Sequence, residues 1–171
     1  TAFDGGSYQW LFNDGAGGRN KDARSLFFYI ATVNTPAMVL EMIGVGSQYA
    51  LAAQDSEDRY LDGAKNYNMT IPADVPAKDF WSLVVYDPQT RSMLQTDQPY
   101  PSKNNERNRD LVTNDDGSTT LWFGPEAPKG KEANWIQTIP GKGWFICLRL
   151  YGPLEPWFEK TWKPGEIELL N

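Results

Sequence analysis

The amino-acid sequence predicts a mainly β domain, an antiparallel β-sandwich of jelly-roll type with two short helices near its N-terminus. From about residue 47 onward, apolar and polar residues alternate with a period of two, which is typical of strands with one buried face. Stretches rich in Asp, Gly and Pro separate these segments, as expected for hairpin connections. The chain has 171 residues, of which 40% are hydrophobic, so it can build one core but not two comfortable ones.

The first part of the chain carries no strand signal. Residues 1–22 are rich in glycine, and we interpret them as an extended arm or linker. Residues 23–171 are predicted to form a C-terminal jelly-roll-like domain. Because the chain opens in a polar, glycine-rich stretch, we expect it to be a fragment of a longer protein.

The two helices are predicted at the start of this domain. Asp22–Ala31 has helical length and good helix-forming residues. Thr35 suits an N-cap and Pro36 the first position of a shorter second helix, which runs to about Met42. Gly44 then follows as a helix terminator.

Roughly six to eight strands are predicted after the helices, most of them joined by hairpins. Turn signals occur at Asp55–Asp58, Asp87–Pro88 and Asp115–Gly117. The polar stretch Thr96–Asp110 is predicted to be a long surface loop, and the strand Phe80–Tyr86 to be covered on both faces. The predicted strands are Ser47–Gln54, Tyr67–Ile71, Phe80–Tyr86, Arg91–Gln95, Thr119–Phe123, Trp135–Thr138 and Trp144–Tyr151.

Charge and composition exclude several classes of function. A net charge of −6 with scattered Lys and Arg argues against nucleic-acid binding. No run of about eighteen apolar residues is present, so no membrane span is predicted. The chain has no histidine, which rules out a Ser-His-Asp triad, a Cys-His pair and an imidazole zinc site within it. No metal or cofactor is expected, and the single cysteine, Cys147, is predicted to be a buried structural thiol.

Carboxylates remain as candidate catalytic groups. Asp87 and Asp97 are the candidates for a catalytic pair, because glycoside hydrolysis uses two nearby acids in opposite protonation states. Asp87 has an alternative structural role as the first residue of a type I turn. The acidic cluster between Asp55 and Asp62 fits no EF-hand spacing and is predicted to be a solvated hairpin.

Two arginines are candidate ligand-binding residues. Arg91 and Arg149 each lie in or beside an apolar strand, where a guanidinium needs a carboxylate or a ligand. They either form buried structural ion pairs or bind an anion or sugar acid beside Trp135 or Tyr86. The chain has seven Trp and eight Tyr, and such rings build cores, sugar-stacking platforms and partner surfaces.

Three long blocks resemble a known family: LDGAKNYNMTIPADVPAKDFWSLVVYDPQTRSMLQTDQPYPS, GKEANWIQTIPGKGWF and LRLYGPLEPWFEKTW. They are similar to the domain of unknown function 1214. The upstream run GGSYQWLFNDGAGGRNKDARSLFFYIATVNTPAM resembles the segment before that domain in members that begin with a domain of unknown function 1254. The resemblance implies a jelly-roll β-sandwich, usually the second of two domains, often in bacterial proteins with export signals. It implies no established activity.

Two functions fit these observations. The first is a non-catalytic binding or assembly domain of a soluble periplasmic or secreted protein, which we expect to form a homo-oligomer. In it, Trp10, Trp157 and Trp162 would dock on the upstream N-terminal domain or on another subunit. The alternative is a carbohydrate-active enzyme with paired carboxylates in a groove shared with that N-terminal domain. The deciding observation is whether two carboxylates share a cleft with a tryptophan face.

Overall fold

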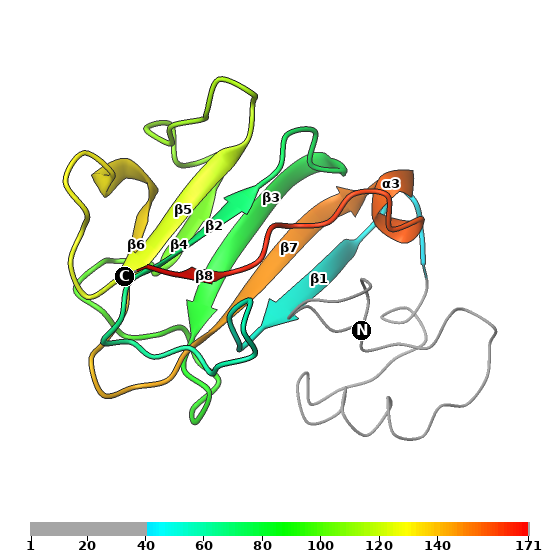
Figure 1. Ribbon diagram of the computed structural model, residues 1–171. Coiled ribbons are helices and arrows are strands. Elements are labelled where there is room, and N and C mark those ends of the chain that lie inside the picture. Colours follow the sequence, from blue (N-terminus) through cyan, green and yellow to red (C-terminus); the bar gives the residue numbers. More distant parts are fainter. Residues whose placement is uncertain (1–40, 171) are drawn as a thin grey trace.

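The computed structural model describes residues 41–170, which form two four-stranded β-sheets with little helix (Figure 1). The predicted arm, the first predicted helix and most of the second lie outside the described residues, and the predicted end of the second, Glu41 and Met42, is not helical. Within residues 41–170 no helix is long and apolar enough to span a membrane. The strands are β1 (Ser47–Ala52), β2 (Tyr67–Ile71), β3 (Ala77–Tyr86), β4 (Ser102–Asn104), β5 (Thr119–Gly124), β6 (Trp135–Gln137), β7 (Phe145–Pro153) and β8 (Glu168–Leu169). The helical turns are η1 (Glu132–Asn134) and α3 (Glu155–Phe158).

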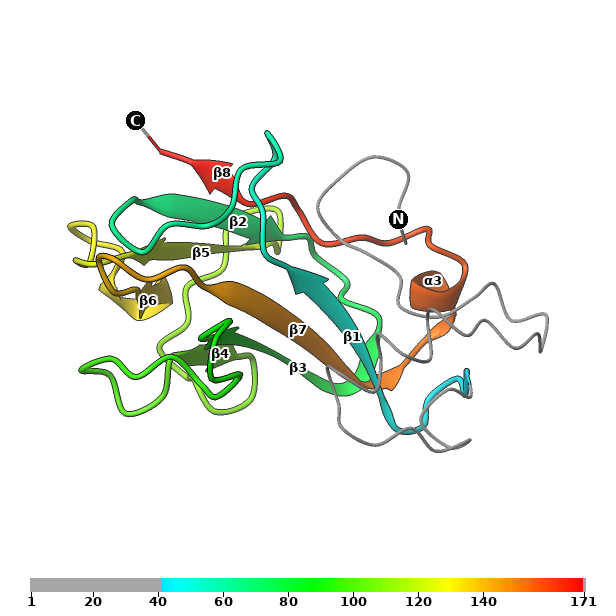
Figure 2. The same cartoon turned by 90° about the horizontal axis from the view of Figure 1, so that it is seen from below.

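The two sheets differ in strand direction. The first sheet has the order β1-β7-β3-β4 and is antiparallel throughout. The second has the order β6-β5-β2-β8, and its β5 and β6 run parallel while the other pairs are antiparallel. Figure 2 shows the sheets as two layers, with β2 and β5 over β7 and β3. The mainly β prediction is therefore confirmed, whereas the expectation of purely antiparallel pairing is wrong for β6.

One hydrophobic core is shared by both sheets. Leu148 from the first sheet and Met69 from the second are fully buried in it. Trp144, just before β7, joins the layers: its ring lies 5.6 Å from Tyr67 in a T-shaped contact and 5.0 Å from Phe123 in a stacked one. Aromatic contacts of this kind bury large areas, so Trp144 fixes the spacing between the sheets at this end of the core.

Strand β3 buries only one of its faces completely. Leu83 and Val85 are fully buried, as the period of two predicts. The alternate residues Phe80, Val84 and Tyr86 are only partly buried, so the prediction that the strand is covered on both faces is wrong. Their apolar side chains belong to the outer face of the first sheet.

Two further segments depart from the predictions. The expected loop Thr96–Asp110 contains β4, which pairs with β3. Its three residues are polar, and so they carry no apolar alternation that could reveal a strand. The expected strand Arg91–Gln95 makes only an isolated bridge, between Met93 and Tyr86.

The C-terminal tryptophans belong to the domain's own core. Trp157 in α3 is fully buried and Trp162 is 9% exposed, and their rings lie 6.4 Å apart. The indole N–H of Trp162 donates to the carbonyl oxygen of Ala73 at 3.1 Å. The prediction that these two rings dock on a partner is therefore wrong, and Trp10 lies outside the described residues.

The acidic segment after β1 is built around a buried carboxylate. Asp55 is 1% exposed and accepts hydrogen bonds from Arg59 Nε at 2.9 Å and from the backbone N–H groups of Glu57 and Arg59. Burial raises the pKa of Asp55, but these bonds outweigh it and the net shift is downward. The solvated hairpin that we predicted is therefore wrong for Asp55, and among the described residues no cluster of acids could hold a metal ion.

Candidate functional site

The outer face of the first sheet gathers two of the predicted ligand-binding residues, Arg149 on β7 and Tyr86 on β3. The strand register places Arg149 opposite Tyr49 of β1 on one side and Ser82 of β3 on the other. Because alternate residues of a strand share a face, Tyr151 of β7 lies on this side too. We call this surface the Arg149 face; its members are Tyr49, Phe80, Tyr86, Phe145, Cys147, Arg149 and Tyr151.

Arg149 is held between two tyrosine rings. Its guanidinium lies 5.1 Å from the ring centroids of both Tyr49 and Tyr151, within the range of cation–π attraction. One terminal N–H donates weakly to the Tyr49 hydroxyl, at 3.4 Å. The Nε atom is buried, and it has no hydrogen-bond acceptor among the described residues. The predicted buried ion pair is therefore absent from this part of the chain, and the charge of Arg149 lacks an anionic counterpart there.

Stacked aromatic pairs frame the arginine. Phe80 stacks on Tyr151 with ring centroids 4.1 Å apart, and Tyr86 stacks on Phe145 at 5.3 Å. Burial raises the pKa of the Tyr86 hydroxyl, so it remains a neutral hydrogen-bonding group near pH 7. The face thus combines one cation with large flat rings, the residue types enriched at protein interfaces.

Cys147 lies two residues from Arg149 on the same face. It is 8% exposed, and burial raises its pKa to about 12. A thiol with such a pKa is protonated at neutral pH and is a poor nucleophile. The structure therefore agrees with the predicted structural thiol.

Asp87 is a structural turn residue. Its side chain is buried and accepts hydrogen bonds from the backbone N–H groups of Gln89 and Thr90 at 2.7 and 3.2 Å, and from Lys142 Nζ at 2.8 Å. Lys142 and these N–H groups lower its pKa to about 2. A general acid needs the opposite shift; the Asp87 carboxylate instead holds the turn and pairs with Lys142.

Asp97 lies elsewhere, against the second sheet. It is exposed, and its Oδ2 accepts a hydrogen bond from the Gln137 side chain at 3.2 Å. The neighbouring Gln98 bonds to the carbonyl oxygen of Trp135 at 3.3 Å. The indole of Trp135 is in turn bonded to Gly124 O at 3.0 Å, so this tryptophan belongs to the second sheet rather than to the Arg149 face.

Arg91 occupies the turn that Asp87 organises. It has a positive φ of 58°, and its backbone N–H donates to the carbonyl oxygen of Asp87 at 2.8 Å. Arg91 is exposed, so the expectation that its guanidinium is buried beside an apolar strand is wrong. Of the four predicted ligand-binding residues, only Arg149 and Tyr86 share a surface.

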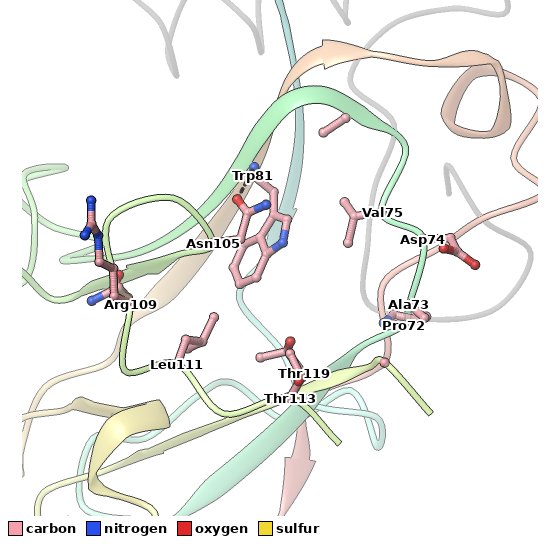
Figure 3. A pocket seen from close by; sticks show the side chains of 13 residues that line it. Pro72, Ala73, Asp74, Val75, Trp81, Asn105, Arg109, Leu111, Thr113 and Thr119 are labelled. Carbon is pink, nitrogen blue, oxygen red and sulfur yellow. Dashed lines mark hydrogen bonds between the residues drawn. The ribbon is translucent and has the colours of Figure 1, made fainter. Parts of the chain in front are cut away.

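A cavity of about 390 Å³ opens at one edge of the two sheets. Figure 3 shows the indole of Trp81 projecting from β3 between Val75 and Leu111, with Asp74 and Arg109 at opposite sides of the lining. The other lining residues are Ala77 and Thr119, at the starts of β3 and β5, and residues of the loops between β2 and β3 and between β4 and β5. Of the described residues that line the cavity, Asp74 alone carries a carboxylate. A carboxylate pair beside a tryptophan is therefore not present there.

Sequence reasoning overlooked Trp81, Tyr49 and Tyr151. Trp81 belongs to an apolar strand, and its pattern resembles that of any core residue. Tyr49 reaches Arg149 from β1, and the 100 residues between the two carry no signal of that contact. Tyr151 lies two residues after Arg149 on β7. Their alternation with buried residues was the one available hint that they share a face.

Comparisons with known proteins yield a family and a fold. The structure resembles the VPA0106 protein from Vibrio parahaemolyticus with a TM-score of 0.66 and 22% identity, over 88% of this chain. The chain spans 35% of that protein's length. An uncharacterised protein from Burkholderia cenocepacia superposes with a TM-score of 0.48 and 15% identity, over 94% of this chain and 45% of that one. None of the curated proteins matches the chain.

The family match covers residues 46–155, from the start of β1 to the start of α3. The matched region contains the whole first sheet, the residues that line the cavity and every predicted site residue. Because the match spans well over half of the sequence, the chain belongs to the family described as protein of unknown function (DUF1214).

Proposed function

We propose that this domain is a non-catalytic binding and assembly module whose Arg149 face docks on an acidic group of an upstream domain in the same polypeptide. The main support is the environment of Arg149. Its guanidinium lies between two tyrosine rings, and its buried Nε has no hydrogen-bond acceptor among the described residues. The jelly-roll description, a periplasmic or secreted location and a homo-oligomeric state belong to the same proposal.

The energetics of a partly buried guanidinium with a buried Nε support an anionic partner. A buried donor without an acceptor costs about 1–3 kcal/mol, and more when the group is charged. Cation–π contacts with Tyr49 and Tyr151 offset part of this cost. A carboxylate from outside the described residues would satisfy the planar fork of Arg149 with paired hydrogen bonds.

The exposure of the face and the size of a relative support the choice of an upstream domain. Tyr49 is 43% exposed, as are large parts of Met42, Ile43 and Val45 just before β1. The chain spans 35% of the VPA0106 protein, so a protein with this fold carries much additional chain beside it. A docked domain would cover the segment that enters β1 together with the Arg149 face.

The alternative, a carbohydrate-active enzyme with paired carboxylates, finds less support. Asp87 has a pKa of about 2 and serves a turn, while Asp97 is exposed and bonded to Gln137. The cavity beside Trp81 has one lining carboxylate among the described residues. An enzyme of that kind would need a second acid from the upstream domain.

Hydroxyl-radical footprinting tests the docking proposal. Chain 1–171 and a longer natural polypeptide that contains it are oxidised in parallel, and mass spectrometry follows each tyrosine. We expect oxidation of Tyr49 to fall several-fold in the longer polypeptide, while Tyr60, which is 80% exposed, reacts equally in both. Arg149→Gln should restore the reactivity of Tyr49, and the exposed control Arg107→Gln should not. Equal oxidation of Tyr49 in the two wild-type proteins would show that no upstream domain covers this face.

A further inference from the structure

We propose that the cavity beside Trp81 binds a small neutral polyhydroxylated molecule, of about mono- or disaccharide size. This inference is independent of the docking proposal, because the cavity lies between the sheets and the Arg149 face lies on the outer side of the first sheet. It concerns binding alone and requires no catalytic carboxylate.

The cavity has the size of a small-molecule site. Its volume is about 390 Å³, within the range of about 300–1,000 Å³ that is usual for ligand pockets. At about 30 Å³ per water molecule, this space holds on the order of a dozen waters. A hexose with its first hydration partners fits such a volume, and a polymer chain would have to extend out of the mouth.

Trp81 supplies an aromatic ring and an indole N–H to the lining of this space. The residue is 4% exposed, and its indole projects into the cavity toward Leu111 (Figure 3). Its Nε1–H has no hydrogen-bond acceptor among the described residues, whereas its backbone N–H donates to Asn105 Oδ1 at 2.9 Å. This N–H is not among the fully buried donors of the described residues that lack a partner, so it stays accessible to a molecule that enters the cavity. The cavity is the place from which a ligand oxygen could supply an acceptor.

Further neutral groups surround the indole. Thr119 is 6% exposed and lines the cavity, and its hydroxyl makes no hydrogen bond within the described part of the chain. Asn105 uses its side-chain oxygen to bind the Trp81 backbone, which leaves its amide hydrogens to face a ligand. An indole N–H, an amide and a hydroxyl provide both donors and acceptors, as the hydroxyl groups of a sugar require.

The distribution of charge favours a neutral ligand. The charged residues that line the cavity are Asp74 and Arg109, which have opposite signs and lie at opposite sides of it (Figure 3). An anion drawn to Arg109 would be repelled by Asp74, and a cation would meet the reverse. Val75 and Leu111 add apolar contact for the C–H surface of a sugar ring.

Nuclear magnetic resonance on the whole chain tests the proposal. The protein is labelled with ¹⁵N, and the indole signal of Trp81 is assigned as the one that Trp81→Phe removes. D-glucose, D-galactose, N-acetylglucosamine and maltose are then titrated separately to high millimolar concentration. We expect at least one of them to shift the Trp81 indole signal in a saturable manner, with smaller effects on the other tryptophans.

Two variants and a matched control locate the binding. Thr119→Val keeps the side-chain shape and removes the hydroxyl, so it should weaken binding about three- to tenfold, the loss expected for one hydrogen bond. Trp81→Phe should have a similar effect when binding is followed through the ligand signals by saturation transfer. Trp122→Phe, at a half-buried tryptophan below Lys131, should leave the affinity unchanged.

Three results would overturn the proposal. The first is that none of the four sugars shifts the Trp81 signal. The second is that Thr119→Val, confirmed as folded by its spectrum, binds the sugar as well as the wild type does. The third is that glucuronate or glucosamine binds more tightly than the matching neutral sugar, which would make charge rather than hydroxyl recognition the basis of the site.

Discussion

Chemical modification of Cys147 gives a direct measure of how closely the outer face of the first sheet is packed. Burial raises the pKa of this thiol from 9.0 to about 12. A shift of this size lowers the fraction of thiolate about a thousandfold at any pH below the ordinary value. Since the thiolate is the reactive species, the native protein should react with a thiol reagent roughly a thousandfold more slowly than an unfolded chain. Steric protection, at 8% exposure, lowers the rate further.

The assay exploits the fact that the chain has one cysteine. Alkylation by iodoacetamide is followed by intact mass at a series of pH values, with the native protein and with the protein in urea. In urea the rate should level off above about pH 9, the range of an ordinary thiol pKa. In the native protein it should keep rising about tenfold per pH unit beyond that point. A native rate that levels off at the same pH as the urea rate, or that approaches it in size, would refute the reasoning.

The same shift predicts how stability depends on pH. A thiol whose pKa is raised by folding holds its proton more tightly in the native state. Its contribution is therefore complete below the ordinary thiol pKa of 9.0 and is lost as the pH rises toward the folded value of about 12. Cys147→Ala should remove this part of the alkaline destabilisation, as measured by urea midpoints between neutral and alkaline pH. An unchanged pH dependence in the variant would assign the effect to other groups, such as Tyr86.

Three further predictions concern the turn, the core and a crowded glycine. Asp87→Asn should lower the urea midpoint at neutral pH. Because folding lowers the pKa of Asp87 to about 2, the difference in midpoint from wild type should shrink as the pH falls below about 4. A difference that persists unchanged in acid would contradict an ionic role. Leu148→Ala, at a fully buried position, should cost about 2–5 kcal/mol in urea unfolding, and a loss below about 1 kcal/mol would show that the site collapses around the gap. Gly63→Ala should lower the melting temperature, since a Cβ there would overlap the carbonyl oxygen of Ile139. An unchanged melting temperature would mean that the backbone of that loop shifts at little cost in free energy.

Local features of the fold could be predicted from the sequence because their causes are local. Every second side chain of β7 faces the core, as the period of two requires: these are Ile146, Leu148 and Leu150. The turn at Asp87 forms because an aspartate binds the backbone N–H groups two and three residues later. The exclusion of histidine chemistry needed only the composition.

The candidate sites depended on contacts between distant segments. Asp87 looked like a catalytic candidate until Lys142, 55 residues away, proved to hold it in the turn with a lowered pKa. The guanidinium of Arg149 and the ring of Tyr49 meet across a strand pair, 100 residues apart in the chain. No spacing rule along the sequence specifies such a pair, because strand neighbours are chosen by the packing of the whole core.

The sequence by itself determined that this chain builds strands, where most of them begin and end, and, for strands with clear alternation such as β2 and β7, which side chains face inward. Only the tertiary structure decided that β6 runs parallel to β5, that β4 completes the first sheet, and that Trp81 and Thr119 line one cavity. The physical reason is that side-chain alternation is a property of a single strand, whereas the order of strands is settled by long-range burial that is shared among all of them.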